Sequence, residues 1–199
     1  MLPRVSRPFD EWTQKAPGGE PPRGRLSAWL REKLFDRRIV LLTGELDDPL
    51  ANEIVAALLS LDAISDEPID LYVDSPDGTL AAAFALIDIL EAVRAPIRIH
   101  CRGQIGGAVL GILTAGDRRV AAAHARFRLG QPRAQFAGTP EQIDAQNRHE
   151  HDRLWRLCAR LARATGRPAE EIAEDMRRGR WLDAGEALQY GLVDEVVGR

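Results

Sequence analysis

The chain has 199 residues, of which 45% are hydrophobic, and its formal net charge is −3. This length is enough for one domain with a sizeable core, and the weakly acidic charge gives no general attraction to nucleic acid or to an anionic membrane. The two cysteines, Cys101 and Cys158, lie in apolar segments, which argues against a disulfide framework and for a reducing compartment. No apolar run reaches the length of a membrane span and no signal peptide is recognised, so we expect a cytoplasmic protein.

The N-terminal segment has a composition of its own. Residues 1–24 are rich in proline, glycine and charge and end in GGEPPRGR. Such a composition is typical of a flexible segment, so we expect a leader here and a single domain over residues 25–199. A short amphipathic helix is expected over residues 26–37.

Strands and helices alternate from residue 38 onward. The first three apolar strands begin 31 and 27 residues apart, and each leads through a turn into a helical pattern. This alternation predicts crossover units in a parallel sheet, and the nearly continuous apolar character of the strands predicts helices on both faces. In the first helix, Asp48 is expected as the cap and Pro49 as the first residue. The predicted strands are 38–42, 69–74 and 96–101, the turns 75–79 and 103–107, and the helices 47–61, 80–93 and 108–115.

The last third of the chain contains a long helix. It is expected to begin at Thr139, where Thr-Pro-Glu-Gln has the pattern of a capping box, and to end at Gly166. A narrow apolar stripe on this helix either packs on the body of the domain or meets another subunit. The stripe consists of Leu154, Leu157, Cys158 and Leu161. Around this helix we expect strands over 118–121 and 125–130, a helix over 168–178, and a short helix and an edge strand in 181–198.

Five stretches occur in a fixed order along the chain. They are EKLFDRRIVLLTGELDD, LYVDSPDGTLAAAFALIDIL, CRGQIGGAVLGILTAG, ARFRLGQP and GRWLDAGEALQYGLVDEVV. In this order and spacing, they resemble the proteolytic subunit of the Clp protease (ClpP), a peptidase S14-like relative of the crotonase fold. The resemblance covers about residues 26–197. It implies an α/β fold, a superhelix of β-β-α and βα units with a protruding handle helix at about 139–166.

The family's Ser-His-Asp triad falls on glycines when it is carried over residue by residue. The serine position matches Gly107, and the histidine position, directly before Gln-Pro, matches Gly130. The aspartate position matches Gly179, or Arg180 if the register moves by one. Glycine supplies neither the attacking oxygen, nor the base, nor the carboxylate that orients the base, so no catalytic residue is expected. No serine follows Ser75 in the sequence.

Oxyanion stabilisation depends on backbone groups and does not need these side chains. The resemblance places the two donors at the backbone N–H groups of Gly78 and Ala108. The family's Ser-Pro-Gly-Gly turn reads Ser-Pro-Asp-Gly here, with Asp77 in place of the first glycine. A carboxylate beside this site would repel a developing negative charge.

The four histidines of the chain do not form a substitute site. His124 is expected to be a structural residue at a strand entrance, and His100 and Cys101 point to opposite faces of their strand. His149 and His151 are two residues apart on a helix and therefore do not share a face. The glycines match neither a dinucleotide-binding nor a phosphate-binding loop. The sequence therefore predicts no metal and no cofactor.

The resemblance also concerns assembly. Active members of the family stack as two seven-membered rings, and an unfoldase docks in apolar pockets between subunits. The matching pocket positions are Tyr72, which is retained, and Asp70, Ala92 and His100, which are changed. A pocket that loses apolar anchors loses docking energy, which weakens the case for docking of a Clp ATPase.

Three possible functions follow from the resemblance. The first is a catalytically inactive, ClpP-like subunit that acts structurally or as a regulator in a ring of itself or of active relatives, as a heptamer or tetradecamer. The second is a crotonase-like enzyme for acyl or acyl-CoA chemistry that uses the backbone donors Gly78 and Ala108. A third is an ordinary serine endopeptidase of the Clp family, if the triad has been misplaced.

Overall fold

The computed structural model describes residues 27–198, and the chain divides into two units after Arg37. In the first unit, helix α2 spans Ala28–Phe35 and is capped by Ser27, whose hydroxyl accepts a hydrogen bond from the backbone N–H of Leu30. The helix expected over 26–37 is confirmed, but its expected amphipathic character is not, since no residue of α2 is buried. The leader expected over 1–24 lies outside the described residues.

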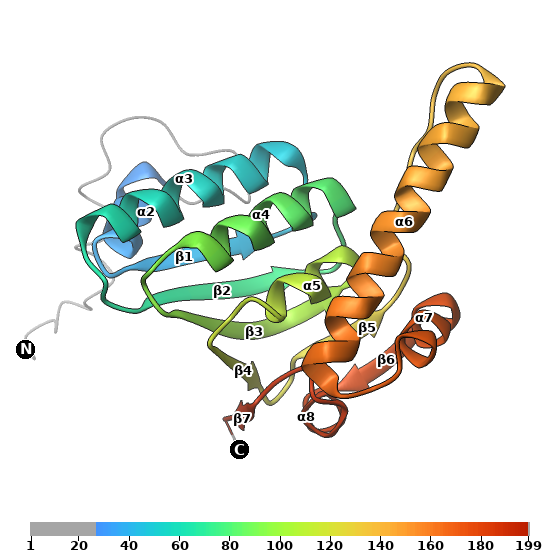
Figure 1. Cartoon of the computed structure of the whole chain (residues 1–199). Helices are drawn as coiled ribbons and strands as arrows, with labels where there is room; N and C mark the ends of the chain where they lie inside the picture. The colour runs from blue at the N-terminus through green and yellow to red at the C-terminus, as the bar shows by residue number, and fades with distance from the viewer. Residues whose placement is uncertain (1–26, 199) are drawn as a thin grey trace, which may run out of the picture. The chain divides into compact units, whose positions relative to one another are not determined.

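The second unit, Arg38–Arg199, is a mixed α/β structure built around a mainly parallel sheet (Figure 1). Its strands are β1 (Ile39–Thr43), β2 (Ile69–Ser75), β3 (Ile97–Gly106), β4 (Arg118–Ala122), β5 (Arg126–Leu129), β6 (Arg180–Asp183) and β7 (Glu195–Val197). Its helices are α3 (Asp48–Ile64), α4 (Leu80–Ala92), the 3₁₀ turn η1 (Gly107–Val109), α5 (Leu110–Leu113), α6 (Pro140–Thr165), α7 (Ala169–Arg178) and α8 (Ala184–Tyr190).

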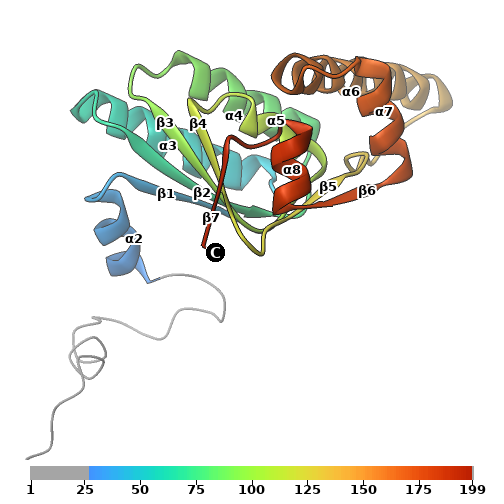
Figure 2. The ribbon, with the colours of Figure 1, turned by 90° about the horizontal axis from the view of Figure 1, so that it is seen from below.

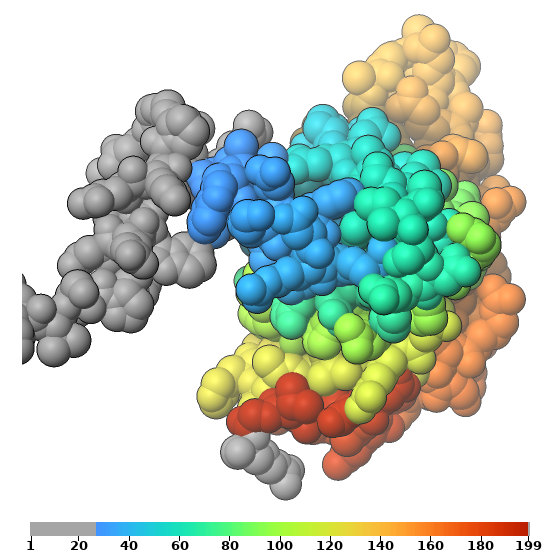
Figure 3. Space-filling model, turned by 90° about the vertical axis from the view of Figure 1, so that its left-hand side faces the viewer, coloured from blue at the N-terminus to red at the C-terminus, as the bar shows by residue number. Residues whose placement is uncertain are grey.

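The path of the sheet runs β1-β2-β3-β4-β7, with parallel neighbours throughout. Strand β3 forks, because its first half pairs with β4 and its last residues, 104–106, pair with β5. Strand β5 then pairs antiparallel with β6. In the space-filling view, the C-terminal segment that contains β7 lies beside the segment that contains β4 (Figure 3). The predicted parallel sheet of crossover units is confirmed.

Two expectations about the end of the sheet are wrong. Residues 103–107 were expected to form a turn, but β3 continues to Gly106 because the pairing with β5 satisfies its backbone groups. Strand β6 was not expected, and it forms because residues 180–183 pair with β5. The fork of β3 and the added strand β6 place β5 and β6 beside the carboxyl end of β3, where the candidate site described below lies.

Within the second unit, the expectation that helices cover both faces of the sheet is also wrong. Helices α3 and α4 lie on the same face of the sheet (Figure 2). Along β2, Ile69, Leu71 and Val73 are fully buried, whereas the alternate residues Asp70 and Tyr72 are only half-buried. The strands therefore alternate as expected for a sheet with one covered face. We call the other side, with Asp70 and Tyr72, the open face.

The starts of two long helices show how local chemistry sets their boundaries. Asp47, not the expected Asp48, caps α3, since it has the extended backbone of a cap and its Oδ1 accepts a 2.9 Å bond from the N–H of Leu50. Helix α6 begins as predicted, with a complete capping box between Thr139 and Gln142.

Helix α6 has two halves with different surroundings. Residues 140–149 are exposed and project away from the sheet (Figure 1). In the second half, Leu157, Cys158 and Leu161 are buried, and an ideal Cβ on Gly111 of α5 would lie 2.5 Å from Cδ1 of Leu157. Of the two readings of the apolar stripe, packing on the body of the domain is the one observed.

Candidate functional site

Two turns at the carboxyl ends of neighbouring strands bring together the residues on which the site prediction depends. Strand β2 ends at Ser75 and leads to Gly78, while β3 ends at Gly106 and leads into η1. The two turns touch, because an ideal Cβ on Gly106 would lie 2.5 Å from the carbonyl oxygen of Pro76. In open α/β sheets, ligands bind at this end of the strands.

The side chain of Asp77 occupies the space that a side chain at position 107 would need. Gly107 has a left-handed backbone with φ of +54°, and an ideal Cβ on it would lie 2.0 Å from Oδ1 of Asp77. The same Oδ1 accepts a 2.8 Å hydrogen bond from the backbone N–H of Gly78. The side-chain space at position 107 thus holds a carboxylate, and one of the two predicted oxyanion donors, Gly78, already has an acceptor. Ala108, the other predicted donor, is fully buried in η1.

The carboxylate of Asp77 is electrostatically strained. Burial raises its pKa above the usual value, and the N–H of Gly78 and the guanidinium groups of Arg133 and Arg128 act in the opposite direction. Glu45 adds to the increase, although its own carboxylate is 3.2 Å from Arg133. The site is therefore a place where a negative charge is costly, as expected for a group held partly out of water.

The predicted histidine position, Gly130, directly follows β5. An ideal Cβ on Gly130 would lie 3.1 Å from Nε of Arg128, so that side chain borders the space an imidazole would need. The guanidinium of Arg128 also lies 6.0 Å from the ring centre of Trp181. Arginine stays protonated in proteins and has no acceptor, so it does not act as a general base.

The two candidates for the aspartate position lie where α7 ends and β6 begins. Gly179 ends α7 with φ of +69°, and an ideal Cβ on it would meet no atom within 4 Å. Arg180 pairs with Leu129 of β5, and its Nη1 is 3.0 Å from Oδ2 of the buried Asp175. The pairing of Leu129 with Arg180 thus brings Gly130 and Gly179 to adjoining strand ends. Neither Gly179 nor Arg180 offers the carboxylate that the aspartate position needs.

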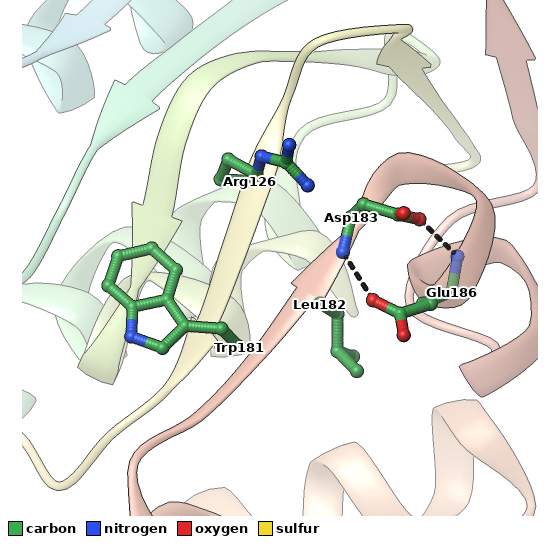
Figure 4. Close-up of a pocket in the computed structure, with 5 residues that line it drawn as sticks. All are labelled: Arg126, Trp181, Leu182, Asp183 and Glu186. Carbon is green, nitrogen blue, oxygen red and sulfur yellow. Dashed lines mark hydrogen bonds between the residues drawn. The ribbon is translucent and has the colours of Figure 1, made fainter.

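An open hollow of about 380 Å³ lies beside these strands (Figure 4). Its lining consists of Arg126, Trp181, Leu182, Asp183 and Glu186. Asp183 and Glu186 form a capping box at the start of α8, in which each side chain accepts the other's backbone N–H at 2.8 Å. The sequence did not indicate this hollow, because it depends on the unexpected strand β6.

A family model for Clp protease matches residues 23–199. The chain belongs to the Clp protease family. The ATP-dependent Clp protease proteolytic subunit 2 of Gluconobacter oxydans is 36% identical over 172 residues, which cover 84% of this chain and 77% of that protein. The resemblance and the α/β fold that it implied are confirmed, and members of this family form oligomeric rings.

Three of the four residues matched to the docking pocket of the Clp family lie together on the open face. The rings of Tyr72 and His100 stack with their centres 4.4 Å apart. Asp70 binds Nε2 of His100 at 2.7 Å and the guanidinium of Arg98 at 2.6 Å. The fourth, Ala92, is the last residue of α4 and is exposed. The three clustered positions form a polar surface, on which Asp70 is also ion-paired with Arg98.

The remaining histidines and cysteines keep the separation expected from the sequence. Cys101 is buried, and burial raises its pKa to about 12, so it remains a thiol. Its neighbour His100 points to the open face instead. His149 and His151 are exposed on α6. Among residues 27–198, no three side chains gather as a metal site, and no helix is long and apolar enough to cross a membrane.

Proposed function

We propose that this chain is a catalytically inactive subunit of a Clp protease-type ring, with a structural or regulatory role. The observation that carries the proposal is the carboxylate of Asp77 in the side-chain space of Gly107. In the proposed alignment, this space belongs to the nucleophile. In an active family member, the serine Oγ at this position attacks the peptide carbonyl. Neither a glycine nor a hydrogen-bonded carboxylate can replace that nucleophile.

The other two positions support the same function. Arg128 borders the space at Gly130, and a permanent cation there neither accepts the proton of a nucleophile nor returns it to a leaving group. At the third position, Gly179 has no side chain and Arg180 is bound to Asp175. Loss of a triad nucleophile or base in a serine protease lowers turnover by about 10⁶-fold, so no measurable peptidase activity is expected.

A serine peptidase with a displaced nucleophile is less well supported. Ser75 is the last serine of the chain and the one nearest to these turns in sequence. Its side chain is fully buried, and its hydroxyl donates a 3.2 Å bond to the carbonyl oxygen of Asp77. A buried hydroxyl with this bond has no path to a substrate carbonyl.

The crotonase-like acyl or acyl-CoA enzyme remains the second candidate. Such chemistry needs two free backbone donors for a thioester oxygen. The retained turns at Gly78 and Ala108 favour it, whereas the bond between Asp77 and the Gly78 N–H opposes it. Thermal stabilisation of the purified protein by acyl-CoA would support this candidate, and no shift at millimolar acyl-CoA would exclude it.

We propose further that the partners of this chain are copies of itself, active Clp protease subunits, or both, in a heptamer or tetradecamer. The projecting half of α6 supports this, because all residues from 140 to 149 are exposed. Docking of a Clp ATPase is not expected, since the polar residues Asp70 and His100 stand where the family has apolar anchors. Asp70 is also ion-paired with Arg98, so this surface costs energy to desolvate.

The decisive experiment measures mass and reactivity on one preparation. Light scattering gives the mass of the assembly, a serine-reactive fluorophosphonate tests for a nucleophile, and a fluorogenic peptide tests for cleavage. An active member of the family, treated identically, is the positive control. A large assembly that takes no label and cleaves nothing is the expected result. Labelling with cleavage would overturn the proposal, and the labelled residue would identify the nucleophile.

A further inference from the structure

In the turn after β2, the carboxylate of Asp77 occupies the backbone N–H of the next residue, Gly78. Oδ1 of Asp77 accepts the N–H of Gly78 at 2.8 Å and lies 2.0 Å from an ideal Cβ on Gly107. The main chain of Asp77 is fixed as well, because its carbonyl oxygen accepts bonds from the N–H of Leu46 at 3.0 Å and from the hydroxyl of Ser75 at 3.2 Å.

We infer that Asp77 is a built-in ligand of the Gly78 amide, and that this hydrogen bond and a side chain at position 107 exclude each other. Residues 77 and 107 are then one linked unit, the Asp77–Gly107 pair. The inference rests on the proposed function only where it calls the Gly78 amide an oxyanion donor. The contacts themselves do not depend on that role.

The pair has a direct chemical consequence. A side chain at position 107 can enter only if the Asp77 carboxylate rotates away and gives up the Gly78 N–H. An acyl oxygen from a substrate meets the same obstacle, because it must displace a carboxylate from that N–H. Serine at position 107 alone would therefore first have to displace the Asp77 carboxylate, whereas Gly107→Ser combined with Asp77→Ala opens the space and frees the Gly78 N–H together.

A double-mutant cycle between Asp77→Ala and Gly107→Ala tests the link. Alanine at 107 adds only a Cβ, and alanine at 77 removes only the carboxylate. The matched control is Gly166→Ala, since Gly166 has a similar φ of +71° but no atom within 4 Å of an ideal Cβ. It reports the cost of a left-handed alanine, which corresponds to a decrease in Tm of about 2–8 °C.

With Asp77 present, we expect Gly107→Ala to lower Tm by at least about 4 °C more than Gly166→Ala does, because of the added clash. In the Asp77→Ala background, the two alanines should cost the same within about 2 °C. Equal costs in both backgrounds would overturn the inference.

Amide hydrogen exchange provides a second test if Gly107→Ala does not fold. In Asp77→Ala, the Gly78 amide loses its acceptor, so its exchange should become at least about tenfold faster. The neighbouring amide of Thr79, which donates to the carbonyl of Leu46 at 3.0 Å, is the internal control. Unchanged exchange at Gly78 would refute the inference. Fluorophosphonate labelling of the unmodified chain would instead refute only the proposed function, so the two failures are distinguishable.

Discussion

The hydroxyl of Tyr190 donates a 2.7 Å hydrogen bond to Oδ2 of Asp175, a carboxylate that is itself buried. Arg180 binds the same oxygen at 3.0 Å, and the guanidinium of Arg167 lies 4.1 Å from the centre of the Tyr190 ring. The network joins α7, β6 and α8 next to the proposed aspartate position. A buried charge is tolerated only with such partners, so Arg180 has a structural role here.

Removal of the Tyr190 hydroxyl tests this network. Burial and the bond to Asp175 raise the pKa of Tyr190, so its O–H remains a donor at neutral pH. We expect Tyr190→Phe to lower the free energy of unfolding by about 1–3 kcal/mol in urea, because a buried carboxylate loses a partner. Tyr72→Phe is the control, since the stack with His100 uses the ring and the expected change is below about 0.5 kcal/mol. Equal losses in the two variants would contradict this role.

The pH dependence of stability tests the strain at Asp77. Its folded-state pKa is raised, first by burial and then by Glu45, against the bonds and charges that lower it. A carboxyl with a raised pKa binds more protons folded than unfolded, so stability falls as pH rises from the unfolded value of about 3.9 through the folded pKa. Asp77→Asn keeps an oxygen acceptor for Gly78 and removes the charge.

Asp77→Asn should therefore have a higher Tm than the unmodified chain at pH 7. The advantage should shrink as the pH falls and disappear at about pH 3, where both forms are neutral at this position. Thermal unfolding of the two proteins in the same buffers gives the difference directly, because the other titrating groups are shared. A constant difference from pH 3 to 7 would show that the charge of Asp77 is not the cause.

Gly78 is expected to be irreplaceable for a steric reason. An ideal Cβ there would lie 2.6 Å from Cβ and 2.8 Å from the carbonyl oxygen of Leu46. These are near-rigid atoms, so Gly78→Ala should lower the free energy of unfolding by about 3 kcal/mol. Gly185→Ala is the matched control, since its Cβ would meet only Oδ1 of Asp183 at 3.4 Å. Placed within α8, that alanine should stabilise by about 0.5–1 kcal/mol. Urea unfolding that gave both the same sign would reject the steric argument.

Much of the fold could be predicted because its signals are local. The capping box at Thr139 and the periodic apolar strands specify their own segments, and the structure has them where expected. Strand β6 gave no such signal, since four residues between two helices form a strand only through pairing with β5. The same is true of residues 104–106, whose strand conformation depends on a partner 22 residues away in the register Gln104–Arg126.

The candidate site could be predicted only in part, for a related reason. The positions Gly107, Gly130 and Gly78 follow from motifs, and the unfavourable charge of Asp77 was expected from its turn. That this carboxylate fills the space at Gly107 depends on contact between two turns, which no spacing along the chain encodes. The role of Arg128 is hidden in the same way, because it depends on the path of β5 beside Trp181.

Truncations in the two halves of α6 should affect different properties, the stability of the subunit in one half and the mass of the assembly in the other. Leu157 is fully buried against α5, so Leu157→Ala should lower the free energy of unfolding by about 2–5 kcal/mol. Ile143, on the projecting half, is 37% exposed, and Ile143→Ala should change that free energy by less than about 0.5 kcal/mol. Urea unfolding is compared at a dilution where light scattering shows single chains.

Ile143→Ala should instead lower the mass of the assembly at higher concentration, since the proposed ring contacts need exposed apolar side chains on this half. Trp155, which is 45% exposed in the second half of α6, gives a further variant, Trp155→Ala, that tests whether the contact extends beyond the projecting half. If Ile143→Ala assembled as the unmodified chain does, the projecting half of α6 would not be the contact between subunits. A stable Ile143→Ala subunit with a reduced assembly mass would locate the contact on that half.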